Sequence, residues 1–498
     1  MNKIALVVLD GLGIRKEKQF NAVKNAKMPY FNSLFKSYSN TLIKTYGSYV
    51  GLSNNQFGNS EVGHLNLGAG RVVKQNSTRI TENIKNGDFF NNKTLITLIN
   101  KLKNNNSYLH LFGLCSNGGV HSELNHLYAI LKLCKQQKFK NVLIHFITDG
   151  RDTDITSGKN YYEELNKKIE TLGVGKIVSL TGRFYAMDRE KNYNRTESFY
   201  NVLTGFESEN CFNNFNEAFN FYYENNITDE FIKPSILNGE KYKLNKNDAV
   251  LCFNFRSDRV RQIFELLIKN KHKNLYSFIE YDKDFTKFVK VIFPEVSSKN
   301  CLSEVLARYN KTQLRISETT KYAHVTYFFN LLREEPFNLE DRIIINSEKT
   351  DDFSKTPKMK AGEITETVIE ETNKKLYDFI LINYSNADMI GHTGDYNATI
   401  KSLEFLDVCL EKLCEDLIKK GYIILVTADH GNADKMMNEN NTICTTHTKS
   451  DAPFIIISNK KYELIKNGKL ANVSPTILNL FNIKPPKEFT ENSLIKHI

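Results

Sequence analysis

The sequence contains no tryptophan, and its eight cysteines include neither a C-x-x-C pair nor the histidine spacing of a zinc finger. These absences exclude the usual signatures of redox dithiols and structural zinc modules. Long apolar runs are also missing: residues 4–9, IALVVL, end at Asp10, well short of the ~20 residues that a membrane helix needs. We therefore expect a cytoplasmic protein without a membrane partner.

Neither basic nor acidic residues dominate the sequence. The net charge of +10 comes from 67 basic and 57 acidic residues spread over 498 positions, without a basic arm or tail. A nucleic-acid binder needs a clustered basic face with stacking aromatics, so we expect no nucleic-acid partner. A small anionic substrate suits this charge better.

The chain is long enough for two or more domains. Short apolar runs typical of buried strands recur at 4–9, 108–114, 142–148, 176–181, 249–255, 342–346, 379–384, 422–428 and 454–458. Amphipathic helical patterns lie between them, as in 124–137 and 400–420. This alternation predicts an α/β fold with largely parallel sheets.

Polar side chains cluster just after the predicted strands, where parallel sheets place their functional groups. Carboxylates and histidines follow the strands of the outer segments, whereas arginines follow those of the middle segment. The change in chemistry along the chain predicts two domains.

The outer segments hold six candidate metal ligands: Asp10, Asp388, His392, Asp429, His430 and His447. Taken singly, each aspartate is equally well explained as a turn cap and each histidine as a hydrogen-bonded structural residue. Together they form a mixed nitrogen and oxygen set that suits Mn²⁺ or Zn²⁺. Asp388 and His392 would share one side of the chain if this segment forms a helical turn, as in other i, i+4 ligand pairs.

Ser60 lies in a glycine-rich stretch, FGNSEVGHLNLGAGR, at residues 57–71. It either caps a helix or acts as a nucleophile. A serine hydroxyl needs an activator, and a nearby metal ion would supply one by lowering the pKa of the hydroxyl.

The middle segment repeats arginines after its strands, in a set that also includes a histidine and an aspartate: His121, Arg151, Asp152, Arg183, Arg189, Arg256 and Arg259. Any single arginine is explained as a solvated surface charge. Five in equivalent places indicate a site for carboxylate and phosphate groups, which the planar guanidinium binds in bidentate fashion.

The ordered motifs VVLDGLG, FGNSEVGHLNLGAGR, GGVHS, TDGRD, GRFYAMDR, FNFRSDR, KYAHVT, REEPF, DMIGH and TADHGN, with a late histidine, span about residues 4–485. This set resembles the cofactor-independent phosphoglycerate mutases of the alkaline phosphatase superfamily. The resemblance implies an alkaline-phosphatase-like, metal-binding domain at 1–74 and 306–498. A substrate-binding phosphotransferase domain would be inserted at 75–305.

The same resemblance assigns roles to the residues. One divalent ion would be held by Asp10, Ser60, Asp429 and His430, and a second by Asp388, His392 and His447. The ions would be Mn²⁺, with Zn²⁺, Co²⁺ or Mg²⁺ as alternatives, and His64, without which both ligand sets are complete, would be a structural residue or would support a ligand. Leu12, Ser257 and residues 330–332 depart from the family pattern without affecting a ligand.

The implied activity is the interconversion of 3-phosphoglycerate and 2-phosphoglycerate by a monomer. It would run through phosphoserine on Ser60, without bisphosphoglycerate. Asp152 would move protons at the glycerate hydroxyls, where the flanking Arg151 favours its carboxylate form. Lys321 would neutralise the phosphoryl group, His121 would orient the substrate, and the five arginines would bind it.

Two other activities remain open on the same superfamily core. A metal-dependent phosphatase or sulfatase would let water attack the phosphoserine, but it has no need for a large arginine-bearing insertion. A phosphopentomutase would be expected to carry a smaller insertion. The arginine-rich middle segment therefore favours the mutase.

Overall fold

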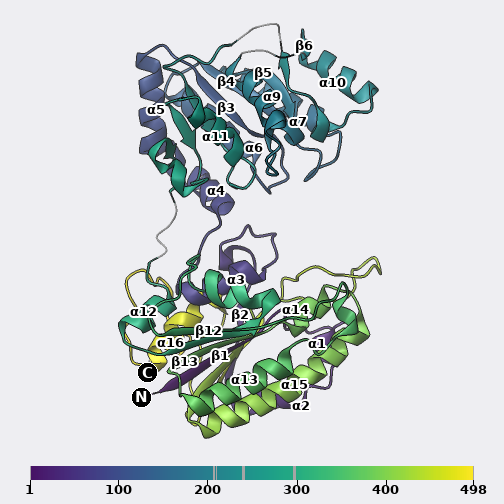
Figure 1. The fold of residues 1–498 in the computed structure, drawn as a ribbon, viewed down its shortest axis with the longest axis vertical. Helices are drawn as coiled ribbons and strands as arrows, with labels where there is room; N and C mark the ends of the chain where they lie inside the picture. Colours follow the sequence, from purple (N-terminus) through teal and green to yellow (C-terminus); the bar gives the residue numbers. More distant parts are fainter. Residues whose placement is uncertain (1, 206–207, 209, 238–241, 295–298, 497–498) are drawn as a thin grey trace. The chain divides into compact units, whose positions relative to one another are not determined.

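The computed structural model describes residues 2–205, 208, 210–237, 242–294 and 299–496. The chain divides into two compact units, drawn in Figure 1: unit 1 comprises residues 1–75 and 297–498, and unit 2 comprises residues 76–296. The second boundary falls before the predicted one at 305/306, which would cut through helix α12 (Leu302–Arg308). Leu302, Val305 and Leu306 of α12 are buried in the core of unit 1, so the whole helix belongs to that unit.

Unit 1 is built on an eight-stranded sheet of order β12-β11-β13-β1-β14-β15-β2-β16. Strands β12, β11, β13, β1 and β14 are mutually parallel, with Leu6 of β1 facing Leu381 of β13 and Leu425 of β14. Strand β15 runs antiparallel to both of its neighbours. The bounds are β1 (Lys3–Leu9), β2 (Ser39–Lys44), β11 (Gln313–Glu318), β12 (Glu340–Ile345), β13 (Phe379–Tyr384), β14 (Tyr422–Thr427), β15 (Ala452–Ile457) and β16 (Gly468–Lys469).

The helices of unit 1 pack in two groups. Helices α1 (Ala22–Asn25), α2 (Pro29–Ser37) and α13 (Ala361–Lys374) contact the long α15 (Tyr396–Lys419), whereas α12 and α16 (Val473–Leu480) contact α3 (Ser60–Ala69) (Figure 1). The side chain of Asp395 caps α15 by accepting from Ala398 N. Its buried stripe includes the leucines that predict an amphipathic helix in the sequence: Leu403, Leu406, Leu410, Leu413 and Leu417.

Unit 2 has its own eight-stranded sheet, of order β10-β9-β8-β3-β4-β5-β7-β6. All neighbouring strands run parallel except β5 and β7. The strands are β3 (Leu109–Leu114), β4 (Val142–Thr148), β5 (Lys176–Gly182), β6 (Asn210–Phe212), β7 (Ser235–Leu237), β8 (Ala249–Cys252), β9 (Leu275–Ser277) and β10 (Val289–Val291). The helices are α4 (Asn76–Asn86), α5 (Lys93–Asn104), α6 (Leu124–Gln136), α7 (Gly158–Leu172), α8 (Arg183–Ala186), α9 (Tyr193–Thr204), α10 (Phe215–Glu224) and α11 (Arg261–Lys269).

The predicted α/β class with two largely parallel sheets is confirmed. Each of the nine apolar runs forms a strand, although β8 stops at Cys252 and leaves residues 253–255 in a loop. Most of these strands are buried along their length because helices or loops cover both faces of a parallel sheet, whereas β12, at the end of its sheet, keeps polar and exposed residues. Within the described residues, no helix has the length and apolar character needed to cross a membrane.

Candidate functional site

The candidate metal site of unit 1 lies at the carboxyl edge of its sheet. Strands β11, β13, β1 and β14 are parallel neighbours, so their carboxyl ends open on the same side. Lys321, Asp10 and the Asp429-His430 pair lie in the segments that follow β11, β1 and β14. Asp388 belongs to the short helix α14 (Asn386–Gly391) that follows β13. Residues far apart in the sequence are thereby brought together by strand order.

Ser60 is the first residue of α3 but does not cap it. The side chain of Asn59 accepts from Val62 N and serves as the cap, which leaves the Ser60 hydroxyl free for the site. Ser60 Oγ lies 2.9 Å from His430 Nε2, 3.1 Å from Asp10 Oδ1 and 2.6 Å from Lys321 Nζ. The hydroxyl thus stands where the strand-end groups converge.

The first of two clusters is formed by Asp388, His392 and His447. Asp388 Oδ1 lies 3.2 Å from His392 Nε2 and 3.3 Å from His447 Nε2, and the two Nε2 atoms are 3.0 Å apart. The Nδ1 atoms donate instead to backbone carbonyls, that of His392 to Thr445 and that of His447 to Gly58. Backbone anchoring of one ring nitrogen leaves the other for a metal ion.

The second cluster surrounds Ser60. His430 Nε2 lies 3.5 Å from Asp10 Oδ1 and 3.6 Å from Asp429 Oδ2. Asp429 Oδ2 is buried and accepts no hydrogen bond, whereas Oδ1 accepts from the backbone of Gly11 and His430. A buried carboxylate oxygen in this state is costly unless a cation satisfies it. The donor set of each cluster therefore fits a divalent ion, with oxygen and imidazole ligands of the kind that Mn²⁺, Co²⁺ and Zn²⁺ accept.

Charges in this site compensate one another. Burial lowers the pKa of Lys321, but the carboxylates of Asp10, Asp388 and Asp429 raise it above its usual range. Burial raises the pKa of Asp10 and of Asp388, yet the Lys321 ammonium holds both well below their ordinary values. Burial lowers the pKa of His430, but the same three carboxylates raise it to about 9. Without metal ions, protons and the lysine carry the positive charge that the carboxylates require.

The predicted anion-binding residues gather in the same way in unit 2. Strands β8, β3, β4 and β5 are parallel neighbours. The loops or helices after them carry, in turn, Arg256 with Arg259, His121, Arg151 with Asp152, and Arg183 with Arg189. Arg183 is almost fully buried, whereas Arg151, Arg189 and Arg256 have about half of their side-chain surface exposed.

Asp149 and Asp258, which the sequence analysis did not single out, organise these cations. Arg183 Nη1 lies 2.6 Å from both Asp149 Oδ1 and Asp152 Oδ2. Asp258 lies 3.1 Å from Arg189 Nη1 and 3.0 Å from Arg256 Nε. Both aspartates belong to motifs already recognised in the sequence, TDGRD and FRSDR, but a motif does not show which cation a carboxylate faces.

The prediction that Arg151 is the cation beside Asp152 was wrong. Arg151 turns toward Glu230, with 3.7 Å between Nη1 and Oε1, and the cation beside Asp152 is Arg183. Adjacent residues in an irregular turn project in different directions, so the chain neighbour is not the spatial neighbour.

His121 and Arg259 reflect the positive field of this cluster. Burial and then the charge of Arg183 lower the pKa of His121 to about 4, so its ring is neutral at pH 7. Burial together with Arg183, Arg189 and Arg151 also lowers the pKa of Arg259. A region in which cations repel one another favours a bound anion.

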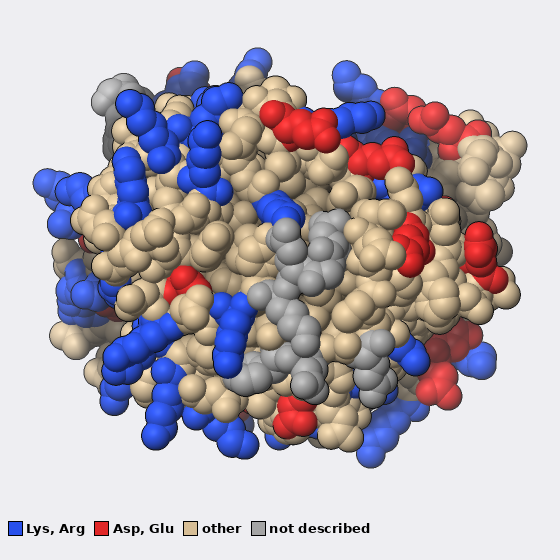
Figure 2. Space-filling view, turned by 90° about the horizontal axis from the view of Figure 1, so that it is seen from above, with Lys and Arg blue, Asp and Glu red and all other residues tan. Residues whose placement is uncertain are grey.

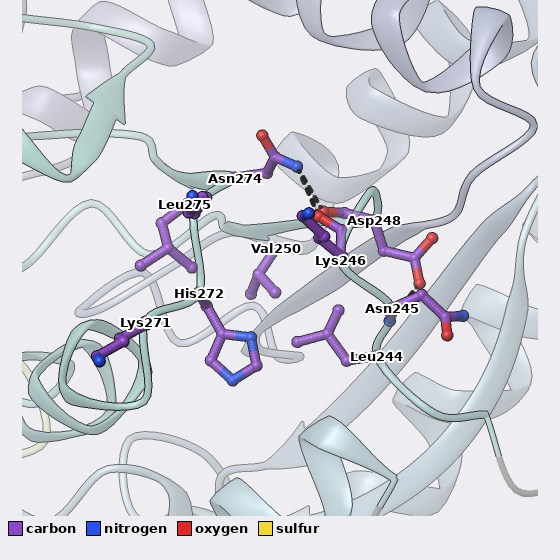
Figure 3. A pocket seen from close by; sticks show the side chains of 10 residues that line it. Leu244, Asn245, Lys246, Asp248, Val250, Lys271, His272, Asn274 and Leu275 are labelled. Atoms are coloured by element: carbon purple, nitrogen blue, oxygen red, sulfur yellow. Dashed lines mark hydrogen bonds between the residues drawn. The ribbon is translucent and has the colours of Figure 1, made fainter.

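A pocket of about 290 Å³, separate from this cluster, opens at the amino edge of the unit 2 sheet (Figure 3). Asp248 and Asn274, just before β8 and β9, line it together with Lys246, Lys271 and His272. It shares no residue with the predicted substrate set, so it is not part of the candidate site. In Figure 2, lysine and arginine lie around the whole visible face and gather most densely on its left, whereas most of the visible aspartate and glutamate lies on its right.

Two residues near Ser60 were not among the predicted site residues. His64 lies one turn along α3, with Nδ1 2.9 Å from Ser60 O and 3.2 Å from Asp429 Oδ2. Asn383 of β13 lies 2.8 Å from Asp10 Oδ2 and 3.0 Å from His64 Nε2. In the sequence, Asn383 stands out only as one amide in the otherwise apolar FILINY run. A pattern of alternating polar and apolar residues gives that amide no functional role.

Comparison with known proteins agrees with this geometry. The family model of the metalloenzyme superfamily matches residues 2–485, and the chain belongs to that superfamily. The 2,3-bisphosphoglycerate-independent phosphoglycerate mutase of Gracilaria tenuistipitata var. liui is 42% identical, covering 100% of this chain and 99% of its own length. The enzyme of the same name from Staphylococcus epidermidis is 41% identical, with 99% of both chains covered.

A crystal structure of Leishmania mexicana phosphoglycerate mutase, described at low cobalt concentration, is similar with a TM-score of 0.64 and 29% identity. It covers 100% of this chain and 98% of its own. The chain belongs to the 2,3-bisphosphoglycerate-independent phosphoglycerate mutase family. The predicted enzyme class is confirmed, and so is dependence on divalent metal ions.

Proposed function

We propose that this enzyme interconverts 3-phosphoglycerate and 2-phosphoglycerate through a phosphoserine on Ser60, without bisphosphoglycerate. The observation that carries the proposal is the position of Ser60 Oγ, within 3.1 Å of Asp10, His430 and Lys321. A serine at the first position of a buried helix, with its hydroxyl facing carboxylate and imidazole groups, is suited to phosphoryl transfer.

We assign one divalent ion to Asp10, Ser60, Asp429 and His430, and the other to Asp388, His392 and His447. When bound, the ions would favour the deprotonated Ser60 hydroxyl and offset the charge of the phosphoryl group. Mn²⁺ is the proposed metal. Co²⁺ is the first alternative, because cobalt is named for the Leishmania mexicana structure, and Zn²⁺ and Mg²⁺ follow.

Lys321 is proposed to neutralise the phosphoryl oxygens. Its ammonium lies 2.6 Å from Ser60 Oγ and from Asp388 Oδ2, so it already stands beside the acceptor oxygen. An ammonium in a buried site interacts with a phosphoryl charge far more strongly than in water.

Unit 2 is proposed to hold the glycerate by Arg151, Arg183, Arg189, Arg256 and Arg259, with neutral His121 orienting it. Asp152 would enter the cycle in its acid form, give its proton to the glycerate oxygen that leaves phosphorus, and take a proton back from the hydroxyl that attacks phosphorus in the second transfer. In the first transfer the Oγ–P bond forms and the P–O3 bond breaks; in the second, O2–P forms and P–Oγ breaks. No proton is gained or lost over the cycle.

We also propose a monomeric, cytoplasmic enzyme. All eight cysteines are free, and seven of them are buried. Free thiols are typical of proteins in reducing compartments.

Phosphorus NMR tests the proposal, with 3-phosphoglycerate and Mn²⁺ supplied and bisphosphoglycerate left out. We expect 2-phosphoglycerate to accumulate with little free phosphate, because glycerate held by the arginines accepts the phosphoryl group before water does. Rapid phosphate release without the isomer would indicate a phosphatase. Activity on pentose phosphates but not on phosphoglycerate would indicate a phosphopentomutase.

A further inference from the structure

Asn383 and His64 form a buried bridge between two of the carboxylates assigned to the same ion. Asn383 Nδ2 lies 2.8 Å from Asp10 Oδ2 and 3.0 Å from His64 Nε2. His64 Nδ1 lies 2.9 Å from Ser60 O and 3.2 Å from Asp429 Oδ2. The bridge therefore runs from Asp10 through Asn383 and His64 to Asp429, and all four side chains are fully buried.

The donors and acceptors along this bridge allow one assignment. His64 Nδ1 faces a carbonyl and a carboxylate, both acceptors, so Nδ1 carries the ring proton. Nε2 is then the acceptor, and the Asn383 amide donates to it. The second hydrogen of the same amide points to Asp10 Oδ2, so both N–H groups of Asn383 are used.

The bridge holds the Asp10 carboxylate by a hydrogen bond and lies against the Asp429 carboxylate without hydrogen bonding to it. Asp10 Oδ2 is held by Asn383, which leaves Oδ1 facing Ser60 and Lys321. Asp429 Oδ1 is held by the backbone of Gly11 and His430, which leaves Oδ2 beside His64 Nδ1. In each carboxylate, one oxygen is fixed by the protein and the other is directed toward the site.

We infer that His64 is a positioning residue of the Ser60 metal site, acting together with Asn383, and is not itself a metal ligand. Coordination through Nδ1 would move the ring proton to Nε2, where it would face the N–H of Asn383, and would remove the side-chain donor to Ser60 O. Coordination through Nε2 would remove the acceptor of Asn383. The inference rests on the proposed ligand set, since it assumes that Asp10 and Asp429 share one ion.

Calorimetric titration of the full-length, metal-stripped protein with Mn²⁺ tests this inference. His64→Ala should bind two ions but weaken one of the two affinities by about 10–100-fold, the usual effect of losing a group that orients ligands. His64→Asn keeps an amide N–H near the Nδ1 position and should restore most of that affinity. Asn383→Asp replaces the donor by a second negative charge beside Asp10, and it should alter the same step.

His392→Ala serves as the reference for a lost ligand, because it should affect the other ion. If His64→Ala and His64→Asn both lost one equivalent of Mn²⁺, His64 would be a ligand and the inference would be wrong. Unchanged affinities in His64→Ala and Asn383→Asp would also overturn it. A wild-type protein that bound fewer than two ions would instead contradict the proposed metal sites. Should His64→Ala fail to fold, Asn383→Ala applies the same criterion from the other end of the bridge.

Discussion

The two functional clusters differ most in their exposure to solvent. Around Ser60 in unit 1, Asp10 and His430 are fully buried and Ser60 is 6% exposed, although His392 of the other cluster has 41% of its side chain exposed. In unit 2, the side chains of Arg189 and Arg256 are 47% and 48% exposed. A metal site needs fixed ligands in a shielded setting, whereas groups that capture an anionic substrate must be reachable from water.

The clusters also differ in how their charge is balanced. Unit 1 balances three carboxylates with Lys321 and a protonated His430 before any ion binds. Within the described residues, the five arginines of the anion-binding cluster of unit 2 form ion pairs with four carboxylates, those of Asp149, Asp152, Asp258 and Glu230. In the unit 1 cluster, a metal ion would replace the positive charge of protons on the ligands. In the unit 2 cluster, the excess positive charge favours a bound anion.

Replacing the nucleophile should have the largest effect. Ser60→Ala should lower kcat by at least about 10³-fold, because removal of an attacking group abolishes covalent catalysis. Most of the Mn²⁺ binding should survive, since the other ligands remain. Steady-state assays with calorimetry check both points, with the exposed Ser53→Ala as the control. Substantial turnover by Ser60→Ala would remove Ser60 from the mechanism.

Metal ions should stabilise unit 1 selectively. At an Mn²⁺ concentration 100 times its Kd, we expect about 2.7 kcal/mol of added stability. Hydrogen exchange should slow in α3 and in the segments after β13 and β14, and the exchange of β3 and β4 should stay unchanged. Comparison of chelated and Mn²⁺-loaded protein measures this. Equal protection in both units would contradict the separation of roles.

Loss of one exposed arginine should weaken substrate capture alone. Arg256→Ala should lower kcat/KM by about 10–100-fold, the usual value of one charge-assisted hydrogen bond, without changing Mn²⁺ affinity. Arg261→Ala is the matched control, because Arg261 donates to Tyr281 O outside the cluster. A change in Mn²⁺ affinity in Arg256→Ala would contradict the assignment of metal binding and substrate capture to separate clusters.

Acidification should weaken metal binding by a smaller step. In the metal-free protein the pKa of His430 is about 9, so its ring carries a proton at pH 7 that an ion must displace. Below pH 9 each unit of acidification should therefore cost about tenfold in Mn²⁺ affinity at the Ser60 site. Titrations at pH 7, 8 and 9 measure this slope, and a flat profile would exclude His430 as a ligand.

The strands that carry the site could be predicted because their chemistry is local. IALVVL and YIILVTA end directly before a functional aspartate, FILINY ends a few residues before Asp388, and these runs form β1, β14 and β13. Strand β11 was missed because QLRISE mixes polar and apolar residues although it is fully buried. Its Arg315 is accommodated by hydrogen bonds to Ser303 and Gln313, which no local pattern reveals.

Pairing within the site was harder to predict than membership of it. The sequence indicates that Asp152 needs a cation, but Arg183, which fills this role, lies beyond a strand and a helix. Asn383 likewise acquires its role only when β13 lies beside β1 and next to α3. Contacts of this kind depend on strand order, and strand order is not encoded in any short segment.

The account depends most on phosphate passing through Ser60, and rapid-quench mass spectrometry measures this directly. Enzyme loaded with Mn²⁺ would be mixed with 3-phosphoglycerate, quenched within a turnover, and digested. The account predicts a phosphorylated peptide carrying residue 60, formed and lost at rates consistent with kcat, while 2-phosphoglycerate appears without free phosphate. Turnover to 2-phosphoglycerate with Ser60 never phosphorylated, or with the phosphate on another residue, would contradict it.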